Sequence, residues 1–367
     1  MSEEILIAQQ LVDRSLKLNG AKVTALEMLA GDMSSRQFAR LSLSGSQVSS
    51  AILVILSHAP GPVGGGTRNL TQDDTYVEVG QYLTAHNVRV PELYADGRDI
   101  SRLLVEDVGS LSLFKAAQAP HQIPPQILAR LGAAPLTELY LKALKIQRQI
   151  ANLPHDQRHV IFQRSTTAEQ RALQINEFLE HYATPRGISE RASSILKELM
   201  REVCLRVERH PKVVSHFDYM ASNIHVLPTG ELCVLDFQDM CLDSPARDVV
   251  SLLNDRDSDS ALGKLRHTEL LKSYLSALNG QPNFSQLYNE YLLLWDLRVS
   301  GRFALLAEKR GIANYSKWIP GTLRRLGRTL YRVRDTIPYA AETLKELSAF
   351  SLEIKHGVED PWELPLN

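Results

Sequence analysis

The stretch "SHFDYMASNIHVLPTGELCVLDFQD", residues 215–239, places three oxygen-bearing side chains at spacings that predict one site. Asp218 and Asn223 precede an apolar run, and Asp236 follows a second apolar run after a turn at 228–230. A short β-hairpin of this kind brings the three side chains to one end. Their oxygens suit Mg²⁺, which takes one or two carboxylates and completes its shell with phosphate oxygens and water. The stretch therefore predicts a magnesium site that handles phosphate.

The rest of the chain divides into a β-rich part and a helical part. Residues 22–57 contain three short apolar or alternating runs, followed by a helical pattern at 75–86 and two more predicted strands at 88–96 and 101–109. From about residue 136 onward, apolar residues recur three and four positions apart, as in amphipathic helices. We therefore expect an α+β chain with a small antiparallel β-rich N-terminal lobe and a larger, mainly helical C-terminal lobe.

Composition limits the classes of function. The 367 residues include 41 Lys and Arg against 42 Asp and Glu, so no net field points to nucleic acid or to an anionic membrane. Three cysteines without a CxxC spacing suit a reducing compartment and argue against a zinc site or a disulfide framework. The acidic start "MSEEILIAQQ" is unlike a signal peptide, and no apolar run approaches a membrane span. We expect a cytoplasmic protein with a small-molecule partner; no oligomeric state is predicted.

Several motifs resemble a known family. The spacing His-x-Asp-x-x-x-x-Asn, with an Asp after the following hairpin strand, is that of the catalytic and metal loops of protein-kinase-like enzymes. The segments "HFDYMASN", "VLDFQD" and "SPARDVVSLL" resemble the aminoglycoside phosphotransferase and choline kinase family of that superfamily. The segments "AGDMSSRQFARL", "LLVEDVG" and "LRVSGRFALLAEKRGIANYSKWIP" are most similar to the bacterial anomeric kinases of N-acetylmuramate and N-acetylglucosamine. The resemblance runs from about residue 20 to 330.

This resemblance implies a protein-kinase-like two-lobed fold that uses ATP and Mg²⁺. The nucleotide-binding N-lobe would span residues 1–107, with a hinge near 104–110, and the C-lobe would span 108–367. The hinge backbone at Glu106 and Val108 would pair with the adenine edge.

The resemblance also implies roles in the two loops. Asp218 would accept the proton of the substrate hydroxyl, and Asn223 and Asp236 would hold Mg²⁺. His216 would be a buried scaffold for the loop. Asp248 is expected at the start of a helix, where its carboxylate would cap free N–H groups in support. Capping near a turn remains the structural alternative for Asp218 and Asn223.

The predicted phosphate contacts depart from those of protein kinases. Ser34, Ser35 and Arg36, at the tip of the first hairpin, would reach the phosphates, although the loop lacks a Gly-x-Gly-x-x-Gly motif. An ordinary turn is the alternative for the two serines. The third strand, within 49–58, contains no lysine to grip the phosphates, so Arg36 or Arg40 could supply the charge.

Other departures bear on the acceptor. Phe217 replaces the arginine that couples regulated protein kinases to a phosphorylated loop, which favours a constitutive small-molecule kinase. Gln238 and Asp239, beside the metal residue, are candidate partners for sugar hydroxyls. Arg302 or Arg298 would suit a substrate carboxylate, with a surface ion pair as the alternative for each.

Three classes of function remain open. The leading hypothesis is an ATP-dependent kinase of an amino sugar such as N-acetylmuramate or N-acetylglucosamine at the anomeric position. The second is a kinase of the same fold for an aminoglycoside, choline or another small alcohol. The third is a non-catalytic nucleotide-binding protein, which the missing lysine favours and the retained trio Asp218, Asn223 and Asp236 opposes.

Overall fold

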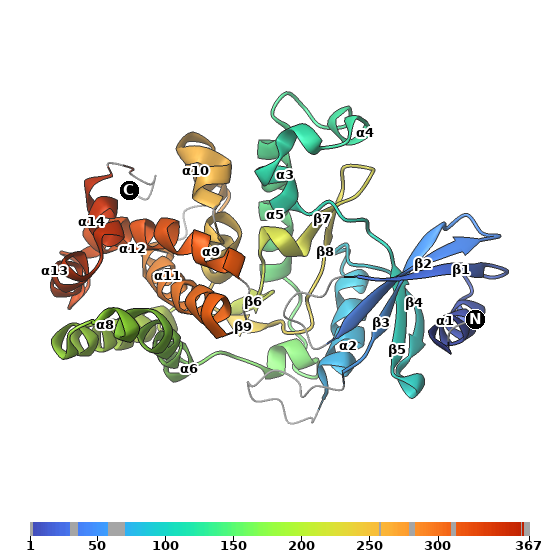
Figure 1. Ribbon diagram of the computed structural model, residues 1–367, viewed down its shortest axis with the longest axis horizontal. Helices are drawn as coiled ribbons and strands as arrows, with labels where there is room; N and C mark the ends of the chain where they lie inside the picture. The colour runs from blue at the N-terminus through green and yellow to red at the C-terminus, as the bar shows by residue number, and fades with distance from the viewer. Residues whose placement is uncertain are drawn as a thin grey trace.

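A β-sheet lies at one end of the molecule and a larger group of helices at the other (Figure 1). The computed structural model describes residues 3–29, 36–57, 70–256, 258–278, 283–309, 313–360 and 362. The fold class expected from the sequence is confirmed, because a small antiparallel sheet is joined to a mainly helical part.

The five strands of the sheet are those that the alternating runs predict. They are β1 (Lys22–Met28), β2 (Gln37–Ser44), β3 (Ser50–Ile55), β4 (Leu93–Gly97) and β5 (Arg102–Glu106). Their order in space is β1-β2-β3-β5-β4, and every neighbouring pair is antiparallel. Sequential hairpins account for most of the sheet, which is why local patterns identify it.

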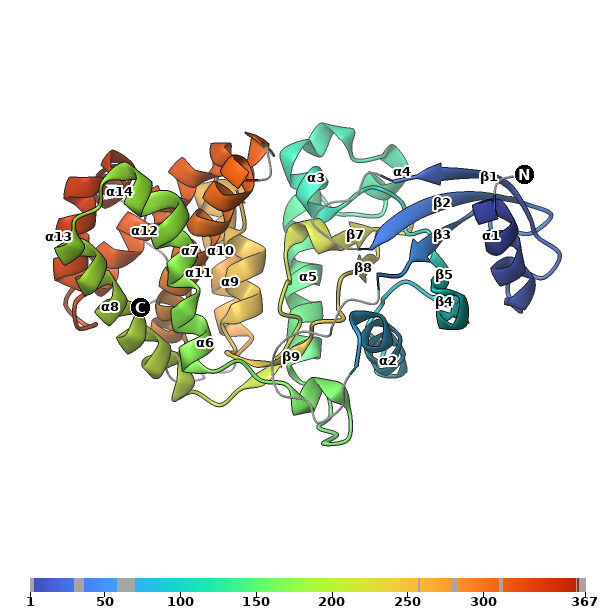
Figure 2. The ribbon, with the colours of Figure 1, turned by 60° about the horizontal axis from the view of Figure 1, so that its bottom comes forward.

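Each face of the sheet packs against one helix. Leu53 belongs to the face that packs on α1 (Glu3–Arg14), an amphipathic helix that the sequence analysis does not identify. The next residue, Val54, belongs to the opposite face, which packs on α2 (Gln72–Ala85). Successive side chains of a strand point to opposite faces, so one strand serves both clusters. Figure 2 shows both helices against the sheet.

The larger part consists of helices around one apolar core. Its described α-helices are α3 (Leu113–Gln118), α4 (Pro125–Leu128), α5 (Pro135–Ala151), α6 (Ala168–Leu173), α7 (Ile175–Phe178), α8 (Glu190–Glu208), α9 (Arg247–Asn254), α10 (Ser258–Ser276), α11 (Phe284–Lys309), α12 (Ile319–Val333), α13 (Ala340–Phe350) and α14 (Leu352–Glu359). A π-helical turn, Leu179–Ala183, continues α7. Within the described ranges, no helix has both the length and the apolar character needed to cross a bilayer.

Two short β-ribbons lie within the helical part. The pair β7 (Ile224–Val226) and β8 (Leu232–Val234) is the predicted hairpin. The pair β6 (Val213–Ser215) and β9 (Cys241–Asp243) is not predicted, because three-residue strands carry no readable periodicity. Together the two ribbons fix both ends of two segments, the 216–223 loop and the 235–240 loop.

Glycine allows two close helix crossings. A Cβ atom built on Gly301 of α11 would lie 2.5 Å from the carbonyl carbon of Glu177 and 2.7 Å from the Cα of Phe178, in α7. In the same way, a Cβ atom built on Gly327 of α12 would clash with the backbone of α14, and one built on Gly357 of α14 would clash with the backbone of α12. Real Cβ atoms do not approach backbone this closely, so a larger residue would force these helices apart.

The boundary between the lobes stays a prediction at residue 107. The last residue of β5 is Glu106, which agrees with a hinge there. However, Val79 and Leu83 of α2 pack into the core of the helical part rather than against the sheet. The second half of α2 therefore connects the two parts.

Candidate active site

The 216–223 loop is fixed to the 235–240 loop by buried hydrogen bonds. The His216 side chain is fully buried, and its Nε2 lies 3.0 Å from the carbonyl oxygen of Leu235. The backbone N–H of Leu235 donates to the carbonyl of Asn223 at 2.8 Å. Burial lowers the pKa of His216, which favours a neutral ring. These contacts agree with a scaffold role for His216.

Both loops contain a residue in the left-handed backbone region. Phe217 has φ 77° and Asp236 has φ 63°. Residues with a Cβ hold such conformations at a cost of about 1–3 kcal/mol, and they cluster at functional sites. The N–H of Phe217 donates to Ser215 Oγ at 3.0 Å, and its carbonyl accepts from Arg247 Nε at 2.8 Å. Buried hydrogen bonds therefore maintain the strained residue that precedes Asp218.

Asp248 lies in the first turn of α9 but does not cap that helix. Its Oδ1 accepts a hydrogen bond from Ser215 Oγ at 2.7 Å, and its Oδ2 accepts from the His216 N–H at 2.8 Å. No side chain caps the start of α9. The expected capping role is therefore wrong, because the end of β6 presents two donors to this carboxylate. Asp248 instead holds the start of the 216–223 loop.

Asp218, Asn223 and Asp236 converge at the end of the β7–β8 ribbon opposite its turn. Asn223 Nδ2 donates to the Asp218 backbone carbonyl at 3.0 Å and lies 3.5 Å from Asp236 Oδ2. Because the amide nitrogen of Asn223 makes these contacts, its Oδ1 is left as an oxygen ligand for a metal beside the Asp236 carboxylate.

The oxygen atoms of Asn223 and Asp236 suit Mg²⁺ bound to phosphates better than they suit a metal ion held by protein ligands alone. In the described parts of the chain, no three or more His, Cys, Asp or Glu side chains are arranged to hold a metal ion. Mg²⁺ on phosphates needs only one or two protein carboxylates and keeps several waters. Asp236 and Asn223, at the exposed end of a ribbon, meet that requirement.

Gln238 and Asp239 differ in their surroundings. Gln238 is buried, and its Nε2 donates to Asp236 Oδ1 at 2.9 Å, so it orients the carboxylate of Asp236. Asp239 is partly exposed, and its Oδ1 has no hydrogen-bond partner among the described residues. Burial, together with the charges of Asp218 and Asp236, raises the pKa of Asp239 to about 6. The Oε1 of Gln238 also lacks a hydrogen-bond partner among the described residues, so both residues have an unused acceptor, and Asp239 is the partly exposed one of the two.

Asp239→Asn should stabilise the metal-free protein more at about pH 7.5 than at about pH 4.5. The folded pKa of about 6 lies above the ordinary aspartate value, so the native state binds this proton more tightly than the unfolded state. Stability is therefore lost as the pH rises from about 4 to 6, and the amide removes that loss. Thermal unfolding measured by circular dichroism at both pH values checks this, with exposed Asp335→Asn as the control. An equal gain at both pH values would contradict it.

Two arginines of the helical part lie over the Phe217 ring. The guanidinium carbon of Arg247 is 3.7 Å from the ring centroid, and that of Arg298 is 5.8 Å from it. Arg247 also donates to Asp243 at 3.0 Å and to the Tyr291 hydroxyl at 2.8 Å. The phenyl ring of Phe217 is therefore contacted by both α9 and α11.

Helix α2 contacts the 235–240 loop through stacked rings. Tyr76 stacks on Phe237 with centroids 4.8 Å apart. The guanidinium of Arg36 lies 5.4 Å from the centre of the Tyr76 ring and pairs with Asp73 at 3.0 Å, with both charged groups buried. Arg36, one candidate to replace the missing lysine, is thus near this loop but paired with a carboxylate.

The hinge candidates lie where β5 ends. The Glu106 N–H donates to the Glu92 carbonyl at 2.9 Å, so a contact with adenine would have to use the Glu106 carbonyl. No hydrogen bond from the Val108 N–H is found within the described ranges. Between these residues, Asp107 accepts from Arg40 Nε at 2.7 Å. Arg40, the second candidate to replace the lysine, therefore holds the hinge.

Arg302 is not brought to the loops. Arg302 pairs with Glu177 of α7 at 3.0 Å, which agrees with the surface ion pair considered for it. Ser34 and Ser35 lie outside the described residues. Arg298, the other candidate for a substrate carboxylate, does lie at the 216–223 loop, with its Nη2 4.0 Å from Asp218 Oδ1. Its position in the Arg-x-x-Gly-x-Phe segment was the available signal.

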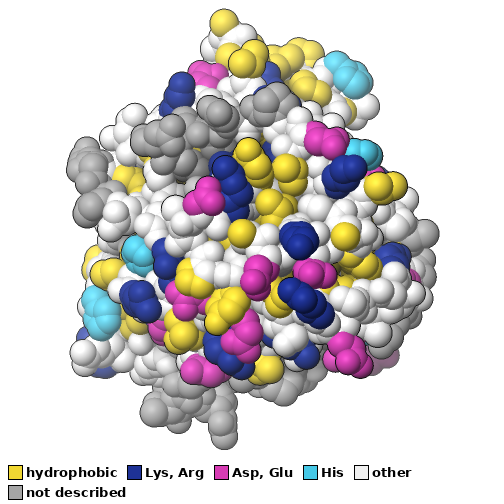
Figure 3. Space-filling model, turned by 90° about the vertical axis from the view of Figure 1, so that its left-hand side faces the viewer, with side chains coloured by type: hydrophobic (Ala, Val, Ile, Leu, Met, Phe, Trp, Pro, Cys, Tyr) yellow, Lys and Arg dark blue, Asp and Glu magenta, His cyan; other side chains and the backbone are white. Residues whose placement is uncertain are grey.

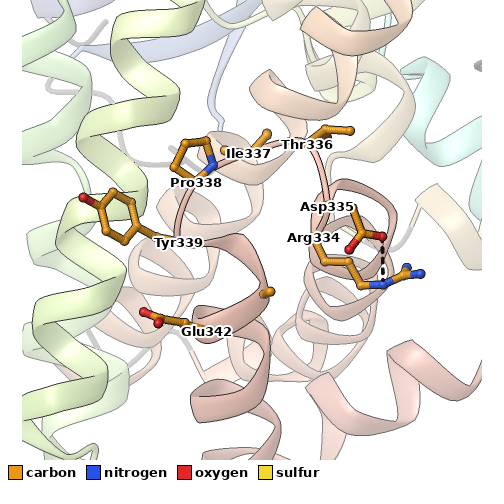
Figure 4. A pocket seen from close by; sticks show the side chains of 8 residues that line it. Arg334, Asp335, Thr336, Ile337, Pro338, Tyr339 and Glu342 are labelled. Carbon is orange, nitrogen blue, oxygen red and sulfur yellow. Dashed lines mark ion pairs between the residues drawn. The ribbon is translucent and has the colours of Figure 1, made fainter.

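A surface hollow lies far from both loops in the chain, at the turn between α12 and α13. It is lined by residues 334–339, 341 and 342, and includes the exposed Arg334–Asp335 ion pair at 3.3 Å (Figure 4). Figure 3 shows the end of the helical part, where basic, acidic and apolar side chains are interspersed. This hollow contains none of the candidate phosphate-handling residues, so the two loops remain the candidate active site.

A family model matches more than half of the chain. It is described as the phosphotransferase enzyme family and matches residues 67–281, which include both loops. No curated protein sequence matches the chain.

Solved structures of small-molecule kinases resemble the whole fold. The ADP-bound aminoglycoside phosphotransferase APH(2'')-Ib matches with TM-score 0.54 and 12% identity over 90% of this chain and 99% of its own. Choline kinase LicA from Streptococcus pneumoniae matches with TM-score 0.54 and 13% identity over 94% of this chain and 99% of its own. A choline/ethanolamine kinase family protein from Mesorhizobium loti matches with TM-score 0.51 and 14% identity over 94% and 98%. Such low identities show a kinase-like fold alone.

Proposed function

This chain belongs to the phosphotransferase enzyme family, and from that premise we propose that it transfers the γ-phosphoryl group of ATP to a hydroxyl of a small molecule. One observation carries the proposal: Asp218, Asn223 and Asp236 converge at one end of the β7–β8 ribbon. A carboxylate for the proton and two oxygen donors for a metal on phosphate are the parts that phosphoryl transfer needs.

Each residue of the trio has a proposed role. Asp218 accepts the proton of the acceptor hydroxyl while that oxygen attacks the γ-phosphorus. Asn223 Oδ1 and the Asp236 carboxylate would hold Mg²⁺, which supplies positive charge to the phosphates when bound. Gln238 orients Asp236 through its 2.9 Å hydrogen bond. His216 and Asp248 keep the loop that carries Asp218 in its strained conformation.

The nucleotide would bind between the sheet and the two loops. The Glu106 carbonyl and the Val108 N–H are proposed to pair with adenine. Support comes from the ADP-bound structure of a protein with a similar fold. Arg36 would act on the phosphates only if it exchanged its partner Asp73.

For the acceptor, we propose an amino sugar such as N-acetylmuramate or N-acetylglucosamine, phosphorylated at the anomeric hydroxyl. The supporting feature is Asp239, a partly exposed carboxylate beside the trio whose buried Oδ1 has no hydrogen-bond partner among the described residues. An aminoglycoside, choline or another alcohol is the alternative, since solved neighbours include an aminoglycoside phosphotransferase and a choline kinase. A non-catalytic nucleotide-binding protein is the third candidate, favoured by the absence of lysine from β3.

The test is a coupled assay of ADP release with N-acetyl sugars, aminoglycosides and choline as acceptors. We expect Mg²⁺-dependent turnover of an N-acetyl sugar. In Asp236→Ala, half-maximal turnover should require Mg²⁺ at least about tenfold more concentrated, because one metal ligand is lost. Asp13→Ala, on the exposed side of α1, is the control and should match the wild type.

Two results would overturn parts of this proposal. If Mg-ATP causes no thermal shift and no acceptor is turned over, the protein is not the proposed kinase. If kanamycin or choline is preferred over every sugar by orders of magnitude, the amino-sugar assignment fails while the phosphotransferase remains.

A further inference from the structure

Arg298 on α11 forms a long ion pair with the proposed base, Asp218. Its NH2 lies 4.0 Å from Asp218 Oδ1, beyond hydrogen-bond distance. Throughout the described part of the chain, no hydrogen bond from its guanidinium group is found. Only 20% of the side chain is exposed. A shielded cation with unused donors thus lies at the site.

Two other shielded arginines of the helical part are hydrogen-bonded to carboxylates. Arg247 donates to Asp243 at 3.0 Å, and Arg325 donates to Asp296 at 2.7 Å. Arg298 is held instead by aromatic rings, with its guanidinium carbon 5.6 Å from the centre of the Trp295 ring and 5.8 Å from that of Phe217. Ring contacts orient a guanidinium group and leave its N–H donors available to a ligand.

The surroundings of Arg298 disfavour its positive charge. Burial, and next the charge of Arg247, lowers the pKa of Arg298. A largely shielded charge whose counterion lies beyond hydrogen-bond distance is unfavourable, so a position of this kind suits a site that receives an anion. The anion present during the proposed reaction is the γ-phosphoryl group.

We propose that Arg298 donates hydrogen bonds to the oxygens of the transferring phosphoryl group and stabilises its charge in the transition state. This inference rests on the proposed phosphotransferase function. In the step, a bond forms between the acceptor oxygen and the γ-phosphorus, and the bond from that phosphorus to the β–γ bridging oxygen breaks. The acceptor proton passes to Asp218, and ADP leaves with the electron pair.

In this role, Arg298 supplies positive charge to the phosphates, which β3 cannot do because it contains no lysine. Arg36 and Arg40 are both hydrogen-bonded to carboxylates, whereas Arg298 lies 4.0 Å from the base and makes no hydrogen bond to it. The acceptor oxygen must lie within hydrogen-bond distance of Asp218 when it attacks. A guanidinium group 4.0 Å from that carboxylate is therefore within reach of the phosphoryl oxygens by a small side-chain movement.

The test compares Arg298→Met, Arg298→Lys and Arg298→Ala with the wild type in steady-state kinetics. We expect Arg298→Met to lower kcat about a hundredfold or more, with the KM for ATP and for the acceptor changed by less than about threefold. Arg298→Lys should retain part of the activity, since it keeps the charge without the planar fork. Free guanidinium ion should restore part of the activity of Arg298→Ala. Arg201→Met, which removes an exposed arginine from α8, should behave as the wild type.

The outcomes separate this inference from the function on which it rests. If Arg298→Met and Arg298→Lys keep the wild-type kcat, the inference is wrong while the kinase stands. A change confined to the acceptor KM also overturns it, because Arg298 would then bind an anionic group of the acceptor. Activity lost in all three variants and not restored by guanidinium ion would indicate a structural role. A wild type that phosphorylates nothing removes the proposed function and this inference together.

Discussion

Asp218→Asn is expected to lower kcat by about three orders of magnitude, because the amide cannot accept the proton of the acceptor hydroxyl. The substitution preserves the size of the side chain. It also leaves the Asp218 backbone carbonyl available to Asn223, which holds the loop at 3.0 Å. Binding of Mg-ATP, measured by titration calorimetry, should therefore change little while turnover in the coupled assay is lost.

A matched control separates this effect from a general charge effect. Asp335→Asn removes one carboxylate from the exposed turn between α12 and α13, where it pairs only with Arg334 among the described residues. Its kcat should equal that of the wild type. Retention of more than about a tenth of the wild-type kcat in Asp218→Asn would contradict the role of Asp218 as the general base.

Gly301→Ala should lower the free energy of unfolding by about 3 kcal/mol, because α11 and α7 leave no space for a side chain. The new Cβ would lie 2.5 Å from the Glu177 carbonyl carbon and 2.7 Å from the Phe178 Cα. Both are backbone atoms, so the clash is relieved only by moving a helix. Urea unfolding followed by circular dichroism checks the expected loss.

The same substitution should also reduce activity. Arg298 lies on α11 three residues before Gly301, so a shift of the helix would move its guanidinium away from Asp218. Gly132→Ala is the matched control, since its Cβ would meet only the end of the flexible Glu138 side chain, at 3.3 Å. Equal stability of Gly301→Ala and the control would contradict the close packing of α11 on α7.

The sheet and the β7–β8 hairpin could be predicted because their signals are local. Alternating apolar residues identify the five strands, and the turn at 228–230 separates β7 from β8. The convergence of Asp218, Asn223 and Asp236 follows from that hairpin alone. Residues that precede the first strand of a short hairpin and follow its second strand meet at the same end, whatever the rest of the fold.

Contacts between distant segments could not be predicted in this way. Arg298 meets Asp218 across 80 positions of sequence, and the contact depends on how α11 packs. Asp248 was assigned to its own helix because capping is the local rule, whereas its partners Ser215 and His216 lie in β6 and the following loop. The strands β6 and β9 are too short to show a pattern. Tertiary packing decides each of these features.

We propose that Asp218 serves a phosphoryl transfer to a small-molecule hydroxyl. The most direct measurement incubates the protein with Mg²⁺, ATP labelled at the γ-phosphate, and N-acetylmuramate or N-acetylglucosamine, and follows the label. We predict that label appears in a sugar phosphate with the wild type and not with Asp218→Asn. Label that remains in ATP or passes only to water with every sugar, aminoglycoside and choline tested would contradict a phosphoryl transfer to a small-molecule hydroxyl.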